Sequence, residues 1–140
     1  MAKNFMAMPI FLKLLTAAAL GMILVIVVTV IPGGSIRVFG RNVADSEWWR
    51  IGAGPFMAIV TLLMIASAVM MLKRTRHSRL AYVIAWIALS ISIPFVAGVA
   101  GVGVAVSKPA LFSNLLLTLA ISLYLYLSKG ARAYFRSPPK

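Results

Sequence analysis

The sequence has no cysteine, one histidine and only two acidic residues among 140. The absence of cysteine excludes disulfides, thiolate metal sites and cysteine nucleophiles. A single histidine, His77, cannot supply a bis-histidine haem or a histidine-rich zinc site from one chain. We therefore expect no cofactor and no metal. Since the sequence offers neither a base clearly paired with a nucleophile nor paired carboxylates outside a helix cap, we also expect no enzymatic activity.

Charge is scarce as a whole. Only 11% of the residues are charged and 62% are hydrophobic, whereas a soluble domain has about 25% charged and about 45–50% apolar residues. A water-soluble fold of this length could not bury so much apolar surface, so the lipid bilayer must be part of the solvent. The composition predicts an integral membrane protein.

Four apolar stretches are long enough to cross a bilayer, because about 20 helical residues span about 30 Å. The first is longer than a signal-peptide core and has no cleavage site near its end, so we interpret it as a retained anchor. Pro94 lies within the third stretch and predicts a kink there. We expect an all-α integral membrane protein of one domain (1–140), an antiparallel up-down bundle of four transmembrane helices spanning residues 10–31, 51–72, 80–106 and 109–127.

The connection formed by residues 32–50 is the longest polar segment and holds both acids, Asp45 and Glu47. Asp45 or Ser46 is expected to cap a short helix, where an acid suits the positive helix end. Aromatic residues near the predicted span ends are typical of the headgroup boundary, where an indole or phenol buries its ring and keeps its polar atom wet. These interface residues are Trp48, Trp49, Tyr82, Trp86 and Tyr134.

The 14 lysines and arginines give the orientation, since short cytoplasmic loops carry the excess of positive charge. Alternating the segments places ten of them on the side of both termini and four on the other. We therefore expect a multi-pass protein of a bacterial inner membrane with both termini in the cytoplasm. Orientation explains the charges without nucleic-acid binding, although the basic clusters could also meet anionic lipid heads. These clusters are Lys73, Arg74, Arg76, Arg79, Lys129, Arg132 and Arg136.

Small residues recur late in the third stretch, with Ala97, Gly101 and Ala105 at every fourth position and Gly98 and Gly103 between them. Such spacing on a helix makes a smooth groove for close approach of a second helix. We interpret the segment as a packing site within the bundle or against a partner. The alternative is a backbone lining of a permeation path, which would require a cavity.

A polar stripe runs along the fourth stretch, where Asn114, Thr118, Ser122 and Tyr126 recur every four residues. An unpaired amide is costly in lipid, so Asn114 must point into protein. Hydrogen bonds between helices, with Ser90 or Thr61 as the partner, are the first interpretation. A polar lining for a solute or a lipid headgroup is the second.

Two functional classes remain. The first is an accessory, assembly or partner-binding subunit, immunity proteins included, which acts through helix contacts with another membrane protein or with itself. The second is a small oligomeric channel or transporter for a solute or lipid, built around the Gly98–Gly103 segment and the Asn114 stripe. No Asp or Glu lies inside a predicted span, and this weighs against proton- or cation-coupled transport.

Overall fold

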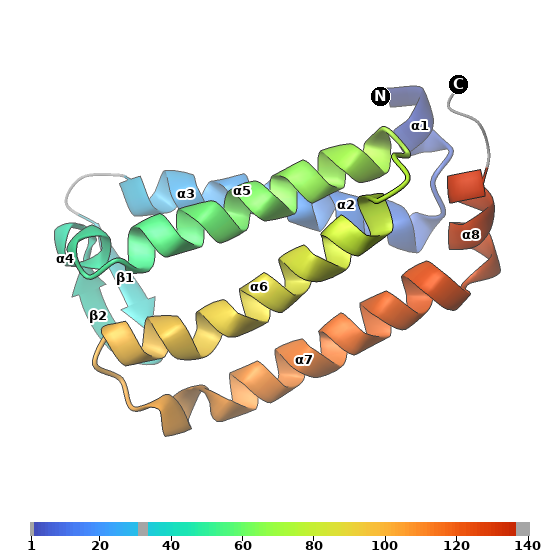
Figure 1. The fold of residues 1–140 in the computed structure, drawn as a ribbon. Coiled ribbons are helices and arrows are strands. Elements are labelled where there is room, and N and C mark those ends of the chain that lie inside the picture. Colours follow the sequence, from blue (N-terminus) through green and yellow to red (C-terminus); the bar gives the residue numbers. More distant parts are fainter. Residues whose placement is uncertain (1, 31–33, 137–140) are drawn as a thin grey trace.

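The computed structural model describes residues 2–30 and 34–136 and is mostly helical (Figure 1). Four of its helical segments are long and apolar enough to cross a membrane: Ile10–Val28, Ala53–Leu72, Ser78–Val99 and Ser107–Leu127. The structure confirms the prediction of a mostly helical chain with four helices that could span a membrane. The elements are α1 (Ala2–Met6), α2 (Ile10–Gly21), α3 (Ile23–Val30), β1 (Ser35–Val38), β2 (Arg41–Ala44), α4 (Asp45–Arg50), α5 (Ala53–Leu72), α6 (Ser78–Val99), α7 (Val104–Leu127) and α8 (Lys129–Arg136).

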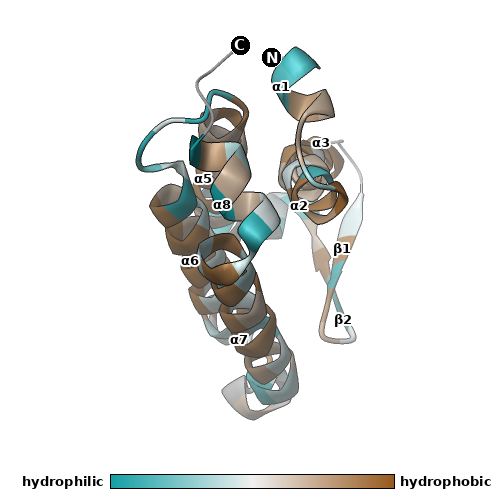
Figure 2. Cartoon of the chain, turned by 90° about the vertical axis from the view of Figure 1, so that its right-hand side faces the viewer, coloured by the Kyte–Doolittle hydropathy of each residue, from teal (hydrophilic) through white to brown (hydrophobic). Residues whose placement is uncertain are grey.

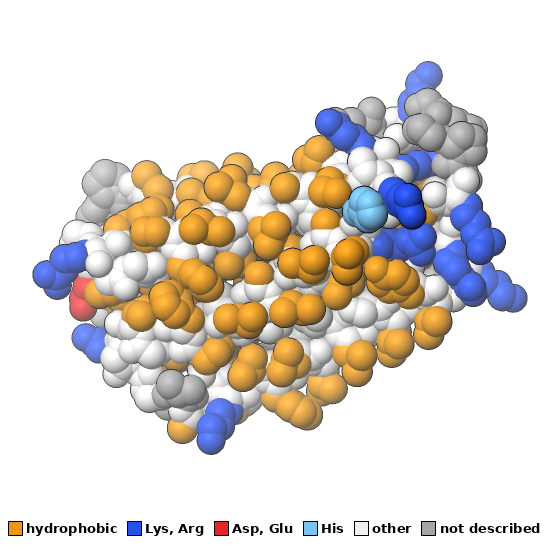
Figure 3. Space-filling model, viewed as in Figure 1, with side chains coloured by type: hydrophobic (Ala, Val, Ile, Leu, Met, Phe, Trp, Pro, Cys, Tyr) orange, Lys and Arg blue, Asp and Glu red, His pale blue; other side chains and the backbone are white. Residues whose placement is uncertain are grey.

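The long helices pack side by side, and most neighbours in space are also neighbours in sequence. The backbones of α2 and α3 lie against α5, α5 lies against α6, and α6 lies against α7. Helices α1 and α8 lie at one end, which we call the terminal end, and β1, β2 and α4 lie at the other, the hairpin end (Figure 1). Apolar residues cover the helices along their length (Figure 2). Lysine and arginine side chains gather at the two ends (Figure 3), as expected for helices with lipid around their middle.

The terminal half of the bundle has its own hydrophobic core, to which α2, α5, α6, α7 and α8 all contribute. Tyr82 of α6 is fully buried there, and its hydroxyl donates to the carbonyl oxygen of Leu15 at 2.8 Å. Asn4 donates from Nδ2 to the Leu72 carbonyl at 3.0 Å, and the hydroxyl of Tyr134 donates to the Met71 carbonyl at 3.3 Å. Two segments far apart in sequence thus satisfy the last carbonyls of α5, which have no partner within the helix.

The hairpin end is more ordered than a polar loop. Strands β1 and β2 are antiparallel, with Val38 opposite Arg41 across a tight turn. Phe39 and Gly40 form this turn with φ values of 46° and 88°, and positive φ at both positions is what a type I′ hairpin requires. Val43 and Trp48 are buried beneath it in a second core, which also receives α5 and α6 residues. The prediction of a wholly α-helical chain therefore missed a small β-hairpin.

The third span ends earlier than predicted. Helix α6 stops at Val99 and not near residue 106. Gly101 has φ +67°, its N–H bonds the Gly98 carbonyl, and the N–H of Val102 bonds the Ala97 carbonyl at 2.9 Å. This pair of bonds after a left-handed glycine is a Schellman motif, which terminates helices. Helix α7 then begins at Val104, so Pro109 lies inside it and does not start it.

The beginning of α4 also differs from expectation. Its N-cap is Ala44, and no side chain caps it, so Asp45 stands inside the first turn together with Glu47. An acid at that position still suits the positive end of the helix. Gly52, with φ +84°, separates α4 from α5, which begins at Ala53.

Candidate functional site

Helix α7 buries one narrow seam along α6. The buried or half-buried residues recur at alternating steps of four and three, which is the 3.5-residue period of helices that stay in contact over a long distance. Outside this seam Ala110, Ser122 and Tyr124 are half-buried, and the large exposed residues in the middle of α7 are Phe112, Leu115, Leu116, Leu117 and Leu119. The seam consists of Ser107, Leu111, Asn114, Thr118, Ile121 and Leu125.

Polar contacts in this seam centre on Ser90 of α6. Nδ2 of Asn114 donates to Oγ of Ser90 at 2.7 Å, and the hydroxyls of Ser90 and Thr118 lie 3.4 Å apart. Ser90 also donates to the carbonyl of Trp86, and Thr118 to the carbonyl of Asn114. Of the two partners considered for Asn114, the structure brings Ser90 to it. Thr61 is buried on α5, and its hydroxyl has no hydrogen-bond partner among the described residues.

The predicted stripe does not continue on one contact face. Ser122 is half-buried and donates to the carbonyl of Thr118 in its own helix, and Tyr126 is 45% exposed. Four residues turn a helix by about 400°, so each step of four drifts about 40° from the preceding one. After Thr118 the drift moves the polar residues off the seam, and Ile121 and Leu125 take their place.

The small-residue segment is divided, contrary to expectation. Ala97 is fully buried in α6, Gly101 lies in the turn after it, and Ala105 is exposed on α7. These three residues therefore do not form one helical groove. A methyl group added at Gly98 or Gly103 would meet nothing within 4 Å, so neither glycine marks a close helix approach among the described residues.

Three of the five predicted interface aromatics are inside the protein, which corrects that prediction. Trp48, Tyr82 and Tyr134 are 4%, 0% and 4% exposed. Each sits near the end of a span, as an interface residue would, but packing and backbone carbonyls inside the bundle hold Tyr82 and Tyr134. Trp49 and Trp86 are half-buried. Residue type and position along the chain cannot tell an inward ring from one that meets headgroups.

The hairpin is fastened to the end of α6 by Arg41. Its Nη1 atom donates to the Ala100 carbonyl at 2.6 Å, and its Nη2 atom lies 3.9 Å from a carboxylate oxygen of Glu47. A cation at the C-terminus of a helix interacts favourably with the helix dipole. The side chains of Arg41 and Glu47 are 51% and 39% exposed, so the ion pair itself contributes little. The sequence placed Arg41 in the polar connection of residues 32–50 but gave no sign of this contact.

The basic residues of the terminal end divide into two groups. The guanidinium carbon of Arg74 lies 4.2 Å from the centre of the Tyr134 ring, and that of Arg79 lies 5.1 Å from the ring of Phe135. These cation–π contacts tie the turn between α5 and α6 to α8. The remaining cluster residues reach the surface: Lys73, Arg76, Lys129, Arg132 and Arg136 are all exposed.

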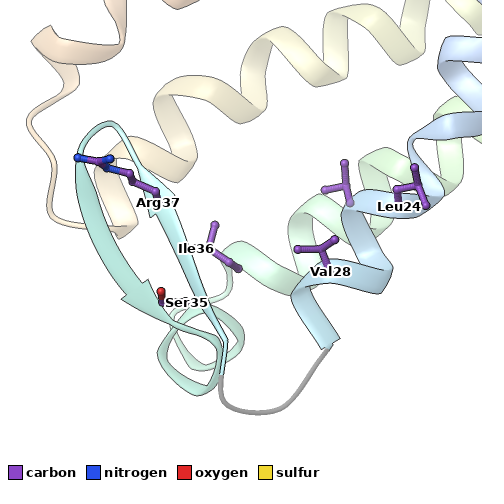
Figure 4. A pocket seen from close by; sticks show the side chains of 6 residues that line it. Leu24, Val28, Ser35, Ile36 and Arg37 are labelled. Atoms are coloured by element: carbon purple, nitrogen blue, oxygen red, sulfur yellow. The ribbon is translucent and has the colours of Figure 1, made fainter.

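The described surface includes a hollow at each end of the bundle. One lies between α3 and β1 and is lined by Leu24, Val25, Val28, Ser35, Ile36 and Arg37. Figure 4 shows Ile36 pointing toward α3, while the charged end of Arg37 points away. The other lies on α8. Among residues 2–30 and 34–136, His, Asp and Glu form no group of three or more that could hold a metal ion.

Comparison of the chain with protein-family models, with curated proteins and with solved structures found no match.

Proposed function

We propose that this protein is a membrane-embedded accessory subunit without catalysis of its own, which acts by packing α7 against a transmembrane helix of a partner membrane protein. The uneven burial of the spans carries this proposal. In its most apolar part α7 has 17% of its residues buried, compared with 22% in the first span, 33% in α6 and 39% in α5. α7 is the span most available for a further contact.

The chemistry of α7 fits such a contact. Asn114 finds its partner in α6, and the hydroxyls of Thr118 and Ser122 bond carbonyls of α7 itself. The outer face of α7 presents large apolar side chains, Phe112, Leu116 and Leu119, which are 65%, 52% and 56% exposed. Helices associate within lipid through van der Waals packing of such surfaces, because lipid tails are as apolar as leucine.

The same hydrogen bonds support packing over the channel or transporter alternative. Asn114 directs its amide at Ser90 of the neighbouring helix, 2.7 Å away. A polar group committed to a neighbouring helix is not available to replace the water around a solute.

The proposed setting is a bacterial inner membrane, crossed four times by an antiparallel up-down bundle. The terminal end faces the cytoplasm, because it carries the larger share of lysines and arginines. We propose that α6 bends around Pro94, which lies inside the helix and has no N–H to donate to the Ser90 carbonyl. Reporter fusions at the C-terminus and in the 39–40 turn test the orientation; activity of a periplasm-specific reporter at the C-terminus would overturn it.

Site-directed photocrosslinking tests the partner contact. A photoreactive residue at Leu116 on α7 is compared with one at Ile59 on α5, which is similarly exposed at 65%. We expect a defined protein adduct from position 116 and lipid adducts from position 59. Equal adducts at both positions would remove the support for α7 as the contact.

Solute flux tests the other functional class. The purified chain is reconstituted into vesicles and compared with its Asn114→Leu variant. We expect no flux from either. Flux from the unmodified chain alone, lost in the variant, would replace the accessory role with transport.

A further inference from the structure

Helix α8 does not extend α7. Ser128 stands between them with φ −62° and ψ 128°, and its Oγ accepts the N–H of Ala131 at 3.5 Å. Serine at such a break caps the helix that follows. Figure 1 shows α8 turned away from the axis of α7, across the terminal end of the bundle. A helix in that place lies at the level where a span leaves the hydrocarbon.

The inner face of α8 is held firmly. Ala131 and Tyr134 are buried, and the Tyr134 hydroxyl donates to α5. Gly130 allows a close approach to the beginning of α2, since a methyl group there would lie 3.4 Å from Cγ of Pro9. The orientation of α8 is therefore set by contacts with α5 and with the beginning of α2.

Three cations lie on the opposite face. At about 100° per residue, Lys129, Arg132 and Arg136 fall within about 60° of one another. All three are exposed, and together with Ala133 they line a hollow of about 390 Å³. Arg132 is oriented by its own hydrogen bond, from Nη2 to the Leu127 carbonyl at 3.0 Å.

No carboxylate side chain balances these charges. The two acidic residues of the chain, Asp45 and Glu47, both belong to α4 at the hairpin end. Three like charges around one hollow repel each other unless an anion joins them. Arginine binds phosphate with two parallel hydrogen bonds, so a phosphate group matches both the charge and the donors of this hollow.

The exposed apolar side of α7 ends at Leu127, whose carbonyl oxygen accepts the hydrogen bond from Arg132 in the hollow. Leu123 and Leu127 share one side of that helix and are 49% and 64% exposed. Figure 3 shows lysine and arginine side chains gathered at the terminal end, with the apolar surface of α7 beginning beside them. A charged head above an acyl path is the chemistry of a phospholipid and not of free phosphate.

We propose that α8 binds one anionic phospholipid, with its phosphate among Lys129, Arg132 and Arg136 and its acyl chains against Leu123 and Leu127. The site stands apart from the proposed partner contact, because it needs only the lipid. Binding at this site requires Lys129, Arg132 and Arg136, whereas general attraction of anionic lipid to the terminal end would depend equally on every basic residue there.

The test compares two double variants that remove the same charges. K129Q/R132Q removes one lysine and one arginine charge from the lining of the hollow. K73Q/R76Q removes one lysine and one arginine charge that are exposed at the same end but outside the hollow. Each protein is incorporated into phosphatidylcholine bilayers containing phosphatidylglycerol and extracted in mild detergent. Native mass spectrometry then counts the retained lipids, and circular dichroism checks that each variant is folded.

We expect the unmodified chain and K73Q/R76Q to retain one phosphatidylglycerol in preference to phosphatidylcholine. Binding to K129Q/R132Q should be roughly thirtyfold weaker, since each cation near an anionic surface contributes about fivefold. Equal losses in both variants would mean general charge attraction and overturn the site. Equal retention of phosphatidylcholine, or displacement of the lipid by inorganic phosphate alone, would also overturn it.

Discussion

Gly54→Ala is the sharpest test of how the hairpin end is packed. Gly54 lies in the first turn of α5, under the two indoles of α4. A methyl group there would come within 2.7 Å of Cδ2 of Trp49 and 3.0 Å of Cδ1 of Trp48. Carbon atoms in contact prefer about 3.5–4.0 Å, and Trp48 is only 4% exposed, so its ring has little room to move.

The magnitude follows from two opposing terms. Alanine in place of glycine within a helix is favourable by about 0.5–1 kcal/mol. Overpacking a filled site costs about 1–3 kcal/mol. Gly21 in α2 provides the matched control, because a methyl group there meets nothing within 4 Å. Gly21→Ala should gain only the favourable term, so Gly54→Ala should be the less stable of the two by about 1–3 kcal/mol.

Both variants are measured by reversible unfolding in mixed micelles, with loss of helical circular dichroism as the signal. Gly54→Ala should cost less stability in a Trp49→Ala background than in the unmodified chain, because the shortest clashes are with the Trp49 ring. Equal stability of Gly54→Ala and Gly21→Ala would refute the packing of the indoles on α5.

Three further variants test single contacts. Arg41→Ala should cost about 1 kcal/mol and speed amide exchange after Ala100, as hydrogen exchange in nanodiscs would show; unchanged exchange would contradict the contact with α6. Asn114→Ala should cost about 0.6 kcal/mol and no more than about 1.7, the range for hydrogen bonds between membrane helices, while its exposed neighbour Ser113→Ala should leave micelle unfolding unchanged. Tyr134→Phe should cost about 0.5–1.5 kcal/mol in the same assay, and a neutral result would argue against the bond from α8 to α5.

Helix ends were harder to predict than helices. The apolar run from 80 to 106 has no charge and no proline after Pro94, so hydropathy alone continues the third span to its end. Helix α6 instead ends at Val99, because Gly101 adopts the left-handed conformation of a Schellman motif. A glycine near the end of an apolar run is compatible both with a packing groove and with a helix stop. Only the backbone angles separate these roles.

The short hairpin was missed for a similar reason. Its strands have four residues each, and its turn is Phe39-Gly40 in place of the favoured Asn-Gly or Asp-Gly. Alternating apolar positions such as Ile36 and Val38 were present, but two such residues carry little information. The strands are stabilised by packing of Val38 and Val43 in one core with Trp48.

Composition by itself determined that the chain has four helices long and apolar enough to cross a membrane, because burial in lipid depends on the sum of side-chain transfer energies along each run. It also located the polar atoms that must find partners. Tertiary structure decided which partners they found: Ser90 for Asn114, a carbonyl of α2 for Tyr82, and the end of α6 for Arg41. Those choices depend on distances between segments far apart in the chain, and local sequence does not encode a distance of that kind.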